Sequence, residues 1–196
     1  ETGTVISLIP ESKATLGSMT QRWRRLQKGR VCNMQYHNIT KDDMLNGEGL
    51  RVVLWVAGCT HGCKECQNPV TWDPNGGLLF DERAKEELFE QLEKSYISGI
   101  TYSGGDPLYV GNREAITALA KEIREKFPEK TQWLYTGYEW NQIQNEAIIP
   151  YLDVVVDGRF EVEQKDTKLH WKGSANQKVI DVQDSLKTGK IVLHDA

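Results

Sequence analysis

The chain has 196 residues, of which 39% are hydrophobic and 27% are charged, and its formal net charge at pH 7 is −4. This composition is typical of a globular domain, and a mildly acidic chain has no general affinity for nucleic acid or anionic membranes. No apolar run approaches the roughly 20 residues that span a bilayer, and the N-terminus lacks the features of a signal peptide. We therefore expect a single cytoplasmic domain that binds neither membrane nor nucleic acid.

Residues 1–33 differ in charge from the rest of the chain. They carry six basic and two acidic residues, a net charge of +4, so the remainder sums to −8. The basic residues are Lys13, Arg22, Arg24, Arg25, Lys28 and Arg30. A basic arm for nucleic acid is one interpretation. Because the segment has neither a helical nor a strand period, we expect instead a disordered or non-native leader, followed by a domain over 34–196 that starts at Met34.

From Met34 onward, apolar runs alternate with helical stripes. The run RVVLWVAG at 51–58 predicts a strand buried on both faces. At 82–97 a helix is predicted by apolar residues at every fourth position, namely Ala84, Leu88, Leu92 and Tyr96. Similar patterns predict strands at 97–105, 131–137 and 152–158, helices at 112–127 and 139–149, and shorter strands at 177–182 and 190–195. This alternation favours an α/β fold with a mainly parallel sheet.

Polar or glycine-rich loops follow four of these strands. Three cysteines follow the first strand, and the turn SGGDP at 103–107 follows the second. The segments TGY at 136–138 and DGR at 157–159 follow the next two. The carboxyl ends of parallel strands meet at one edge of a sheet, where α/β proteins bind ligands. We therefore expect these four loops to form one site.

The first of these loops, GCTHGCKECQN, indicates metal ligands in a reducing compartment, because the chain shows no export signal. One interpretation is a zinc site completed by His61, although structural zinc ligands usually form two separated pairs. A reactive pair of Cys63 and Cys66 is a second interpretation, and it leaves Cys59 unexplained. Three thiolates can also hold a [4Fe–4S] cluster with one iron open to a small molecule, which accounts for all three cysteines. Cys32 is not expected to be a ligand.

A CxxxCxxC loop after a first strand and a GGDP turn after a second resemble the radical S-adenosylmethionine (SAM) superfamily. Within it, the chain is similar to the family of activating proteins of the anaerobic ribonucleoside-triphosphate reductase. The similarity is carried by blocks at 46–72, 103–108, 133–138, 154–160 and 171–181. The segment MQYHNITKDDMLNGEG also resembles the opening of that family. The resemblance covers essentially all of 34–196 and none of 1–33.

The resemblance implies a glycyl-radical activase. Cys59, Cys63 and Cys66 would hold a [4Fe–4S] cluster, and SAM would bind the open iron. The residues implied in binding this cofactor are Gly104, Gly105, Asp106, Thr136, Gly137 and Tyr138. A low-potential electron donor would reduce the cluster, and the radical made from SAM would take a hydrogen from the Cα of one glycine. That glycine would belong to the partner, the large subunit of the anaerobic ribonucleoside-triphosphate reductase.

The resemblance also implies an incomplete (β/α) barrel of the radical-SAM type. A closed barrel takes about 250 residues, whereas 34–196 contains 163. We therefore expect a barrel that is open on one side, where a loop of a partner protein could enter. Asp157 and Arg159 are expected at the same edge, with Arg159 either balancing a carboxylate or remaining a solvated charge. Asn176 and Gln177 match family residues, but the sequence alone gives them no role.

The chain departs from the family pattern at two positions. Glu65 stands where many superfamily members carry an aromatic residue against adenine, and Gln67 replaces a tyrosine common in close relatives. Adenine must therefore be held by other groups. Two alternatives stay close to this function: an activase of another glycyl-radical enzyme, such as pyruvate formate-lyase, or a small radical enzyme that acts on a metabolite. A zinc-binding interaction module that uses the basic leader on nucleic acid is a more distant alternative.

Overall fold

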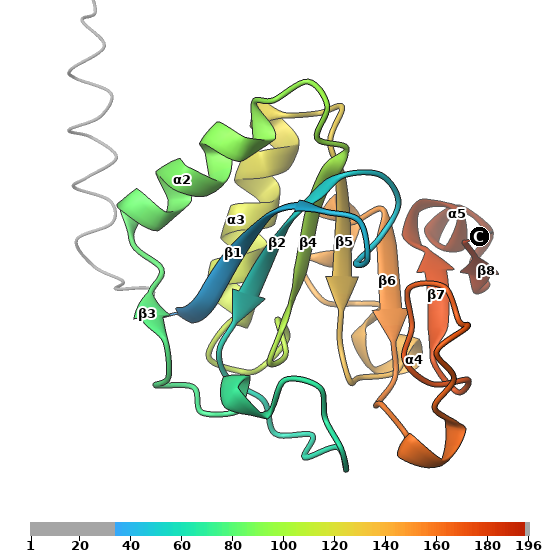
Figure 1. Cartoon of the computed structure of the whole chain (residues 1–196). Coiled ribbons are helices and arrows are strands. Elements are labelled where there is room, and N and C mark those ends of the chain that lie inside the picture. The colour runs from blue at the N-terminus through green and yellow to red at the C-terminus, as the bar shows by residue number, and fades with distance from the viewer. Residues whose placement is uncertain (1–33, 195–196) are drawn as a thin grey trace, which may run out of the picture. The chain divides into compact units, whose positions relative to one another are not determined.

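The computed structural model describes residues 34–194, which form one eight-stranded sheet with helices packed against it (Figure 1). The strand order is β3-β1-β2-β4-β5-β6-β7-β8. β2, β4, β5 and β6 are parallel, whereas β1 and β3 at one end and β7 and β8 at the other pair antiparallel. The chain therefore has a mixed α/β fold with a parallel centre.

The central strands end together at one edge of the sheet. The strands are β1 (Gln35–Asp43), β2 (Arg51–Val56), β3 (Leu78–Leu79), β4 (Gly99–Gly104), β5 (Thr131–Tyr135), β6 (Val154–Asp157), β7 (Lys178–Asp181) and β8 (Val192–Leu193). Val56 at the end of β2 pairs with Gly104 at the end of β4, and Tyr135 at the end of β5 pairs with Val156. The loops that follow these strands are therefore brought to the same edge, as the sequence predicts.

Alternate residues of the central strands face opposite sides of the sheet, as the pleat of a strand requires. On one side the strands share the main core with the helices, through residues such as Leu54, Tyr102, Leu134 and Val155. On the other side a smaller cluster contains Trp133, Val154, Val156 and Val179, with Tyr135 and Trp171 packed against it. The sheet thus buries apolar side chains on both faces, and the second face borders the candidate site.

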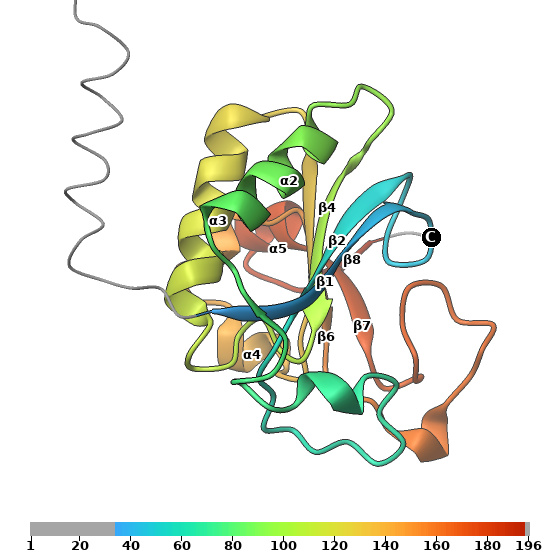
Figure 2. The ribbon, with the colours of Figure 1, turned by 60° about the vertical axis from the view of Figure 1, so that its left-hand side comes forward.

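The helices are α2 (Glu82–Leu92), α3 (Arg113–Lys126), α4 (Trp140–Ile143) and α5 (Val182–Thr188), with 3₁₀ turns η1 (Pro69–Thr71), η2 (Ile149–Tyr151) and η3 (Val162–Gln164). Figure 2 shows α2, α3 and α5 on the same side of the sheet. α2 begins where the Asp81 carboxylate accepts a hydrogen bond from the Ala84 amide at 3.0 Å. α5 begins at the equivalent cap, Asp181, and ends at Gly189, whose φ is 67°. These are ordinary start and stop signals of helices.

Most predicted elements are present in the structure. The predictions at 51–58, 97–105, 112–127, 131–137 and 152–158 each contain an element of the expected kind. The helix predicted at 82–97 ends at Leu92, so Tyr96 lies beyond it and is 53% exposed. The helix predicted at 139–149 is a single turn, α4, and the chain then enters η2, where Pro150 lacks the amide a helix would need.

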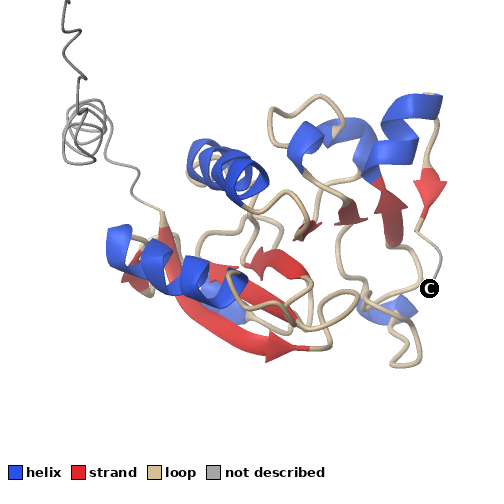
Figure 3. Ribbon diagram, turned by 90° about the horizontal axis from the view of Figure 1, so that it is seen from above, coloured by secondary structure: helices blue, strands red, loops and turns tan. Residues whose placement is uncertain are grey.

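The prediction of a mainly parallel sheet is right only for its centre. β7 pairs antiparallel with β6, because the connection between them contains loops and η3 rather than a crossover helix. β1 and α5 were not predicted at all. Figure 3 shows β1 and β8 toward opposite ends of the sheet, and the outermost strands β3 and β8 do not pair with each other. The sheet formed by residues 34–194 is therefore open.

The predictions about the leader and about Cys32 fall on residues 1–33, outside the part of the chain that the structure describes. The described part begins at Met34, which is 1% exposed and whose carbonyl accepts a hydrogen bond from the Phe80 amide at 2.9 Å. Met34 is therefore a packed part of this fold. Within residues 34–194, no helix has the length and apolar character needed to cross a membrane.

Candidate metal centre

The three cysteines lie in the loop between β2 and η1, which we call the cysteine loop (residues 58–68). Backbone hydrogen bonds close the base of this loop: the Gly58 amide donates to the Thr71 carbonyl at 2.8 Å, and the Cys59 amide donates to the Trp72 carbonyl at 3.1 Å. The Gly58 carbonyl accepts from the Asp106 amide at 2.8 Å. The base of the cysteine loop is thus bound to η1 and to the turn after β4.

Cys59, Cys63 and Cys66 are free, half-buried thiols that line one cavity of about 540 Å³. The Cys66 amide donates to the Cys63 carbonyl at 3.2 Å, and the Asn68 amide lies 3.4 Å from the Cys66 sulfur. The structure therefore brings all three predicted ligands to the wall of the same cavity. Thiols in this arrangement are suitable donors for iron or another thiophilic metal.

Burial raises the pKa of the Cys59 thiol. The negative charges of Asp106, Cys63 and Cys66 raise this pKa further, while a hydrogen bond from the His61 backbone amide acts in the opposite direction. Because metals bind the thiolate form, binding of a metal must displace the protons of these thiols.

The side chains around the cysteines do not form a site for a single ion. Among the residues that the structure describes, no group of three or more His, Cys, Asp or Glu side chains could hold one metal ion. The Nε2 atom of His61 lies 2.5 Å from the Asp106 carboxylate and is not directed at the thiols as a fourth ligand. A cubane cluster binds each thiolate through a different iron, so its ligands need not converge on one point. The donor set therefore fits a cluster better than a zinc ion.

The turn after β4 lies against the end of β2. Gly104 has a φ of 109°, and the Gly105 amide donates to the Val56 carbonyl at 2.8 Å. A Cβ atom on Gly105 would lie 2.5 Å from the Gly58 carbonyl oxygen, and one on Gly104 would lie 2.5 Å from the Val56 oxygen. Both glycines line the cavity with the cysteines. The neighbouring backbone therefore leaves no room for a side chain at either position, whether or not a ligand is bound.

Asp106 lies beneath the wall of the cavity rather than in it. Its residue is 1% exposed, and it is absent from the lining of the cavity. Its carboxylate accepts hydrogen bonds from the Thr136 hydroxyl at 2.9 and 3.0 Å, the Gly137 amide at 3.1 Å and the Leu108 amide at 2.7 Å. The carboxylate therefore joins the turn after β4 to the loop after β5.

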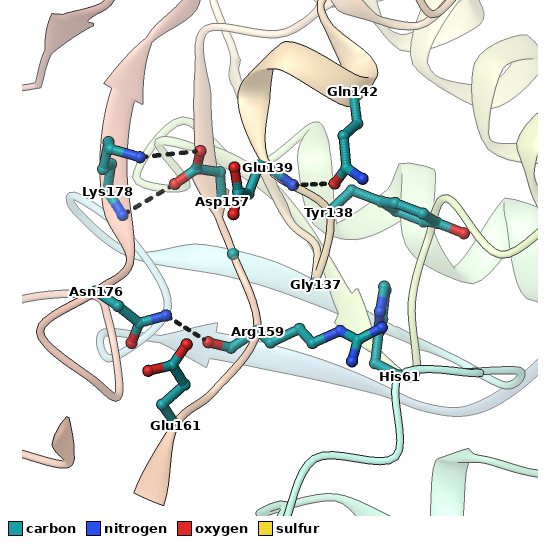
Figure 4. Close-up of a pocket in the computed structure, with 11 residues that line it drawn as sticks. His61, Gly137, Tyr138, Glu139, Gln142, Asp157, Arg159, Glu161, Asn176 and Lys178 are labelled. Carbon is teal, nitrogen blue, oxygen red and sulfur yellow. Dashed lines mark hydrogen bonds and ion pairs between the residues drawn. The ribbon is translucent and has the colours of Figure 1, made fainter. Parts of the chain in front are cut away.

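Thr136 and Gly137 line the cavity with the cysteines, whereas Tyr138 lines a neighbouring cavity of about 380 Å³ (Figure 4). Asp157 and Arg159 also line this second cavity. The Asp157 carboxylate is buried and accepts from the Trp140 amide at 2.9 Å and the Lys178 amide at 3.0 Å. Asp157 is therefore held by the fold, while Arg159 is exposed at the cavity wall.

Asn176 and Gln177 acquire a structural role. The Asn176 side-chain amide donates to the Arg159 carbonyl at 2.9 Å, and that of Gln177 donates to the Gly158 carbonyl at 2.9 Å. The Gln177 side-chain oxygen also accepts from the Gly173 amide at 2.9 Å. Together they fasten the loop after β6 to the segment before β7, a structural role that the sequence alone did not indicate.

The cavity that contains the cysteines has an aromatic wall, which was not predicted from the sequence. This wall contains Trp55, Trp72, Tyr135, Phe160 and Trp171. The Tyr135 hydroxyl is buried without a hydrogen-bond partner, and burial raises its pKa, so it remains a neutral donor. The two-residue period of Trp133 and Tyr135 in β5 was a signal that both face one side of the sheet, but it could not show which side holds the site.

Comparisons with known proteins agree with this donor set. Residues 45–180 match the family model described as a 4Fe-4S single cluster domain. An anaerobic ribonucleoside-triphosphate reductase-activating protein of Enterobacteria phage T4 is 45% identical over 146 residues, which cover 74% of this chain and 93% of the relative. The chain belongs to this family of activating proteins. Relatives of the same name from Haemophilus influenzae and Escherichia coli K12 are 40% and 37% identical, each over 74% of this chain and 96% or 97% of their own length.

These relatives confirm the resemblance to the activating-protein family that was predicted from the sequence. The residues that match the 4Fe-4S domain include the whole cysteine loop, the turn at 103–107 after β4 and the loop at 136–138 after β5. This match confirms the prediction of an iron–sulfur cluster domain and argues against a zinc-binding interaction module.

Proposed function

We propose that the chain is a radical-SAM activase that generates a glycyl radical on the large subunit of an anaerobic ribonucleoside-triphosphate reductase. One observation carries this proposal. In a chain of the activating-protein family, three free thiols lie around one cavity with the turn after β4 (Gly104 and Gly105) and the loop after β5 (Thr136 and Gly137). A low-potential electron donor would serve the cluster. The free thiols favour a reducing compartment, for which the cytoplasm is our proposal.

Cys59, Cys63 and Cys66 would hold the [4Fe–4S] cluster, and the cavity beside them would receive SAM. Bound together, the reduced cluster and SAM supply a one-electron cleavage of the sulfonium carbon–sulfur bond, which gives methionine and a radical that can take a hydrogen atom from a glycine Cα. The chain's own contribution is to bind, orient and shield these groups. No protein acid or base is needed for this transfer of a hydrogen atom.

Two kinds of group in the cavity wall would bind and shield the cofactor: polar backbone segments and aromatic side chains. Gly104 and Gly105 bring backbone to one wall, and Thr136 and Gly137 bring a second backbone segment to the next. The aromatic wall defined above lines the remaining space with apolar surface, which would limit the access of water to a reactive intermediate. Arg159 forms no ion pair with another described residue, and we propose that it meets a carboxylate of the cofactor or of the partner's peptide.

The open sheet supports a protein substrate. We propose that it is the incomplete barrel of a radical-SAM activase, with β3 and β8 as its two unpaired edges. A loop of the reductase that carries the glycine would then enter from the open side and approach the cavity. An enzyme for a small metabolite would gain by closing this side over its substrate.

The decisive experiment is an activation assay with anaerobically reconstituted protein. Iron and zinc analysis and an electron paramagnetic resonance spectrum establish the metal first. Reductant, SAM and the reductase large subunit should then yield methionine, 5′-deoxyadenosine and a glycyl radical on the partner. A Cys63→Ala protein is the control and should yield none of these products.

Three results would contradict the proposal. A colourless protein with stoichiometric zinc would show that the chain is a zinc-binding interaction module instead. A radical on pyruvate formate-lyase and none on the reductase would identify a different activase. Normal SAM cleavage with consumption of a metabolite, and no radical on a protein, would identify a small radical enzyme.

A further inference from the structure

His61 and Asp106 form a buried contact between the cysteine loop and the turn after β4. The His61 Nε2 atom lies 2.5 Å from the Asp106 carboxylate, and the two side chains are only 7% and 2% exposed. We propose that these two side chains form a latch that positions the cysteine loop over the cavity, so that both are positioning residues rather than contacts of the cluster or of SAM. The inference deepens the proposed function and rests on it for its effect on SAM.

His61 is the main attachment of the outer part of the cysteine loop. Backbone bonds of Gly58 and Cys59 tie down the base, and the Cys66 amide bonds within the loop. Of the other described contacts between residues 60 and 65 and the rest of the fold, the ion pair of Lys64 with Glu163 is long, at 3.5 Å, and more than 70% exposed on both sides. Exposed pairs of this kind contribute little. Loss of His61 would therefore leave the segment between Cys59 and Cys66 held only at its ends.

The imidazole of His61 fits a slot built by the loop after β5. Its ring meets the Tyr138 ring edge to face, with centroids 4.7 Å apart. A Cβ atom on Gly137 would lie 2.4 Å from the His61 Cδ2 atom, so any larger residue at this position would require the ring to move. Figure 4 shows His61 beside Gly137 and Tyr138. The slot is thus shaped for an aromatic ring, and Asp106 supplies its polar end.

Asp106 connects this ring to two strand ends at once. Besides His61, its carboxylate accepts from the Thr136 hydroxyl, the Gly137 amide and the Leu108 amide. Four donors occupy the lone pairs of a carboxylate, which leaves little capacity to bind a ligand. The carboxylate therefore acts on the site by joining the segments after β2, β4 and β5. Because Nε2 points to Asp106, the latch also withholds this atom from the metal centre.

The test compares His61→Phe, Asp106→Asn and the double variant with wild type. Phenylalanine keeps a ring in the slot but has no nitrogen to bond, and asparagine keeps the shape of Asp106 without its charge. Asp153→Asn is the matched control. Its carboxylate binds the Arg124 guanidinium at 2.6 Å and the Gln132 amide at 2.7 Å, away from the cysteine loop.

Hydrogen exchange followed by mass spectrometry, on the metal-free and the reconstituted full chain, measures the latch directly. Loss of a hydrogen bond to a charged group should speed exchange in residues 59–68 by about tenfold or more, with little change in β4 and β5. The double variant should exchange no faster than the faster single variant, because the two side chains act as one pair. Asp153→Asn should lower the melting temperature without a selective effect on residues 59–68.

SAM binding supplies a readout that loss of stability alone would not change. In His61→Phe with full iron content, the spectral change of the reduced cluster on SAM addition should require about tenfold more SAM. Unchanged exchange in residues 59–68, equal acceleration in β4 and β5, or additive effects in the double variant would each overturn the latch. If the wild-type cluster does not respond to SAM, the proposed function fails, while exchange in the metal-free chain still decides whether the latch exists.

Discussion

The Arg51 guanidinium lies over the Trp133 ring, 5.2 Å from its centroid, at the edge of the sheet opposite the cysteines. Arg51 is fully buried and donates five hydrogen bonds, which end on the hydroxyls of Thr101 and Thr131 and the carbonyls of Glu48, Ile100 and Thr131. Burial lowers the pKa of Arg51 to about 10, so the side chain is still a cation at neutral pH. One buried charge thus fastens β2, β4 and β5 at their amino ends.

We predict that Arg51→Lys lowers the free energy of unfolding by about 2 kcal/mol, because lysine offers only three donors and lacks the planar fork of arginine. Urea denaturation of the metal-free protein at pH 7.5 measures this change. Arg83→Lys, at an exposed position of α2, is the control and should change the same quantity by less than about 0.5 kcal/mol. Equal effects of the two substitutions would show that the fork of Arg51 contributes nothing.

A second prediction concerns alkaline pH. The Tyr102 hydroxyl is buried and donates to the Gln132 side-chain oxygen at 2.6 Å, and burial raises the pKa of Tyr102 above its ordinary value of 10.0. Tyr102→Phe should therefore cost about 1–3 kcal/mol below pH 10, because the Gln132 oxygen loses its donor. Above pH 10 the unfolded tyrosine ionises while the folded one does not. The wild type should then lose this advantage by up to about 1.4 kcal/mol per pH unit.

Urea denaturation of both proteins at several values between pH 8 and pH 11 tests the alkaline prediction. Tyr96→Phe, at an exposed position, serves as the control and should follow the wild type at every pH. A difference between Tyr102→Phe and wild type that stays constant across this range would contradict the prediction.

The centre of the fold was predictable because its strands are unambiguous in sequence. Runs such as RVVLWVAG are long, apolar and bounded by loops, and they appear as buried parallel strands. The edge strands carry a weaker signal: β1, QYHNITKDD, is polar at most positions and owes its place to pairing with β2. α5 was missed although Asp181 and Gly189 mark its two ends. Its seven residues contain too few turns for an apolar stripe to show.

A third prediction concerns the ligands. Cys59→Ala, Cys63→Ala and Cys66→Ala should each abolish the [4Fe–4S] cluster, because two thiolates cannot hold a cubane against loss of iron. Iron and sulfide analysis with electron paramagnetic resonance after anaerobic reconstitution provides the measurement. Cys32→Ala is the control and should keep its full iron content. Cluster loss in the Cys32 variant would mean that the ligands are assigned wrongly.

A fourth prediction follows from the packing of Gly105. A valine there would place its Cβ 2.5 Å from the Gly58 carbonyl oxygen, directly before Cys59. Gly105→Val should therefore lower the free energy of unfolding by about 2 kcal/mol or more and reduce iron incorporation, in addition to weakening SAM binding. The reason is displacement of the cysteine loop itself, which the sequence alone did not suggest.

Gly62→Ala is the control for this fourth prediction. Gly62 has a φ of 62° within the cysteine loop, but an added Cβ would meet no atom within 4 Å. This variant should lose only the roughly 1 kcal/mol of backbone strain and keep its cluster. Thermal unfolding and iron content measure both variants. Normal iron content in Gly105→Val would show that the turn after β4 does not position the cysteines.

The candidate site was predictable to the extent that its residues lie in the loops after parallel strands. Cys59, Gly104 and Thr136 could be assigned to one edge because strand order brings those loops together. The division of roles among them could not be predicted. Asp106 could face either a ligand or the protein interior. The choice depends on how side chains pack between the segments after β2, β4 and β5, and a single sequence contains no measure of that packing. The role of His61 was hidden for the same reason.

Both outermost strands of the described sheet, β3 and β8, are two residues long. Their leucines are exposed: Leu78 by 62%, Leu79 by 46% and Leu193 by 57%. A long edge strand of this apolar character would offer a row of unpaired backbone groups to a second copy of the chain and would invite aggregation. Two residues allow only a few intermolecular hydrogen bonds. The rest of this edge is β1, which pairs with β3 only at Gln35 and Tyr36 and is polar at most positions. The sheet can therefore remain open for a partner without presenting a long apolar edge for self-association.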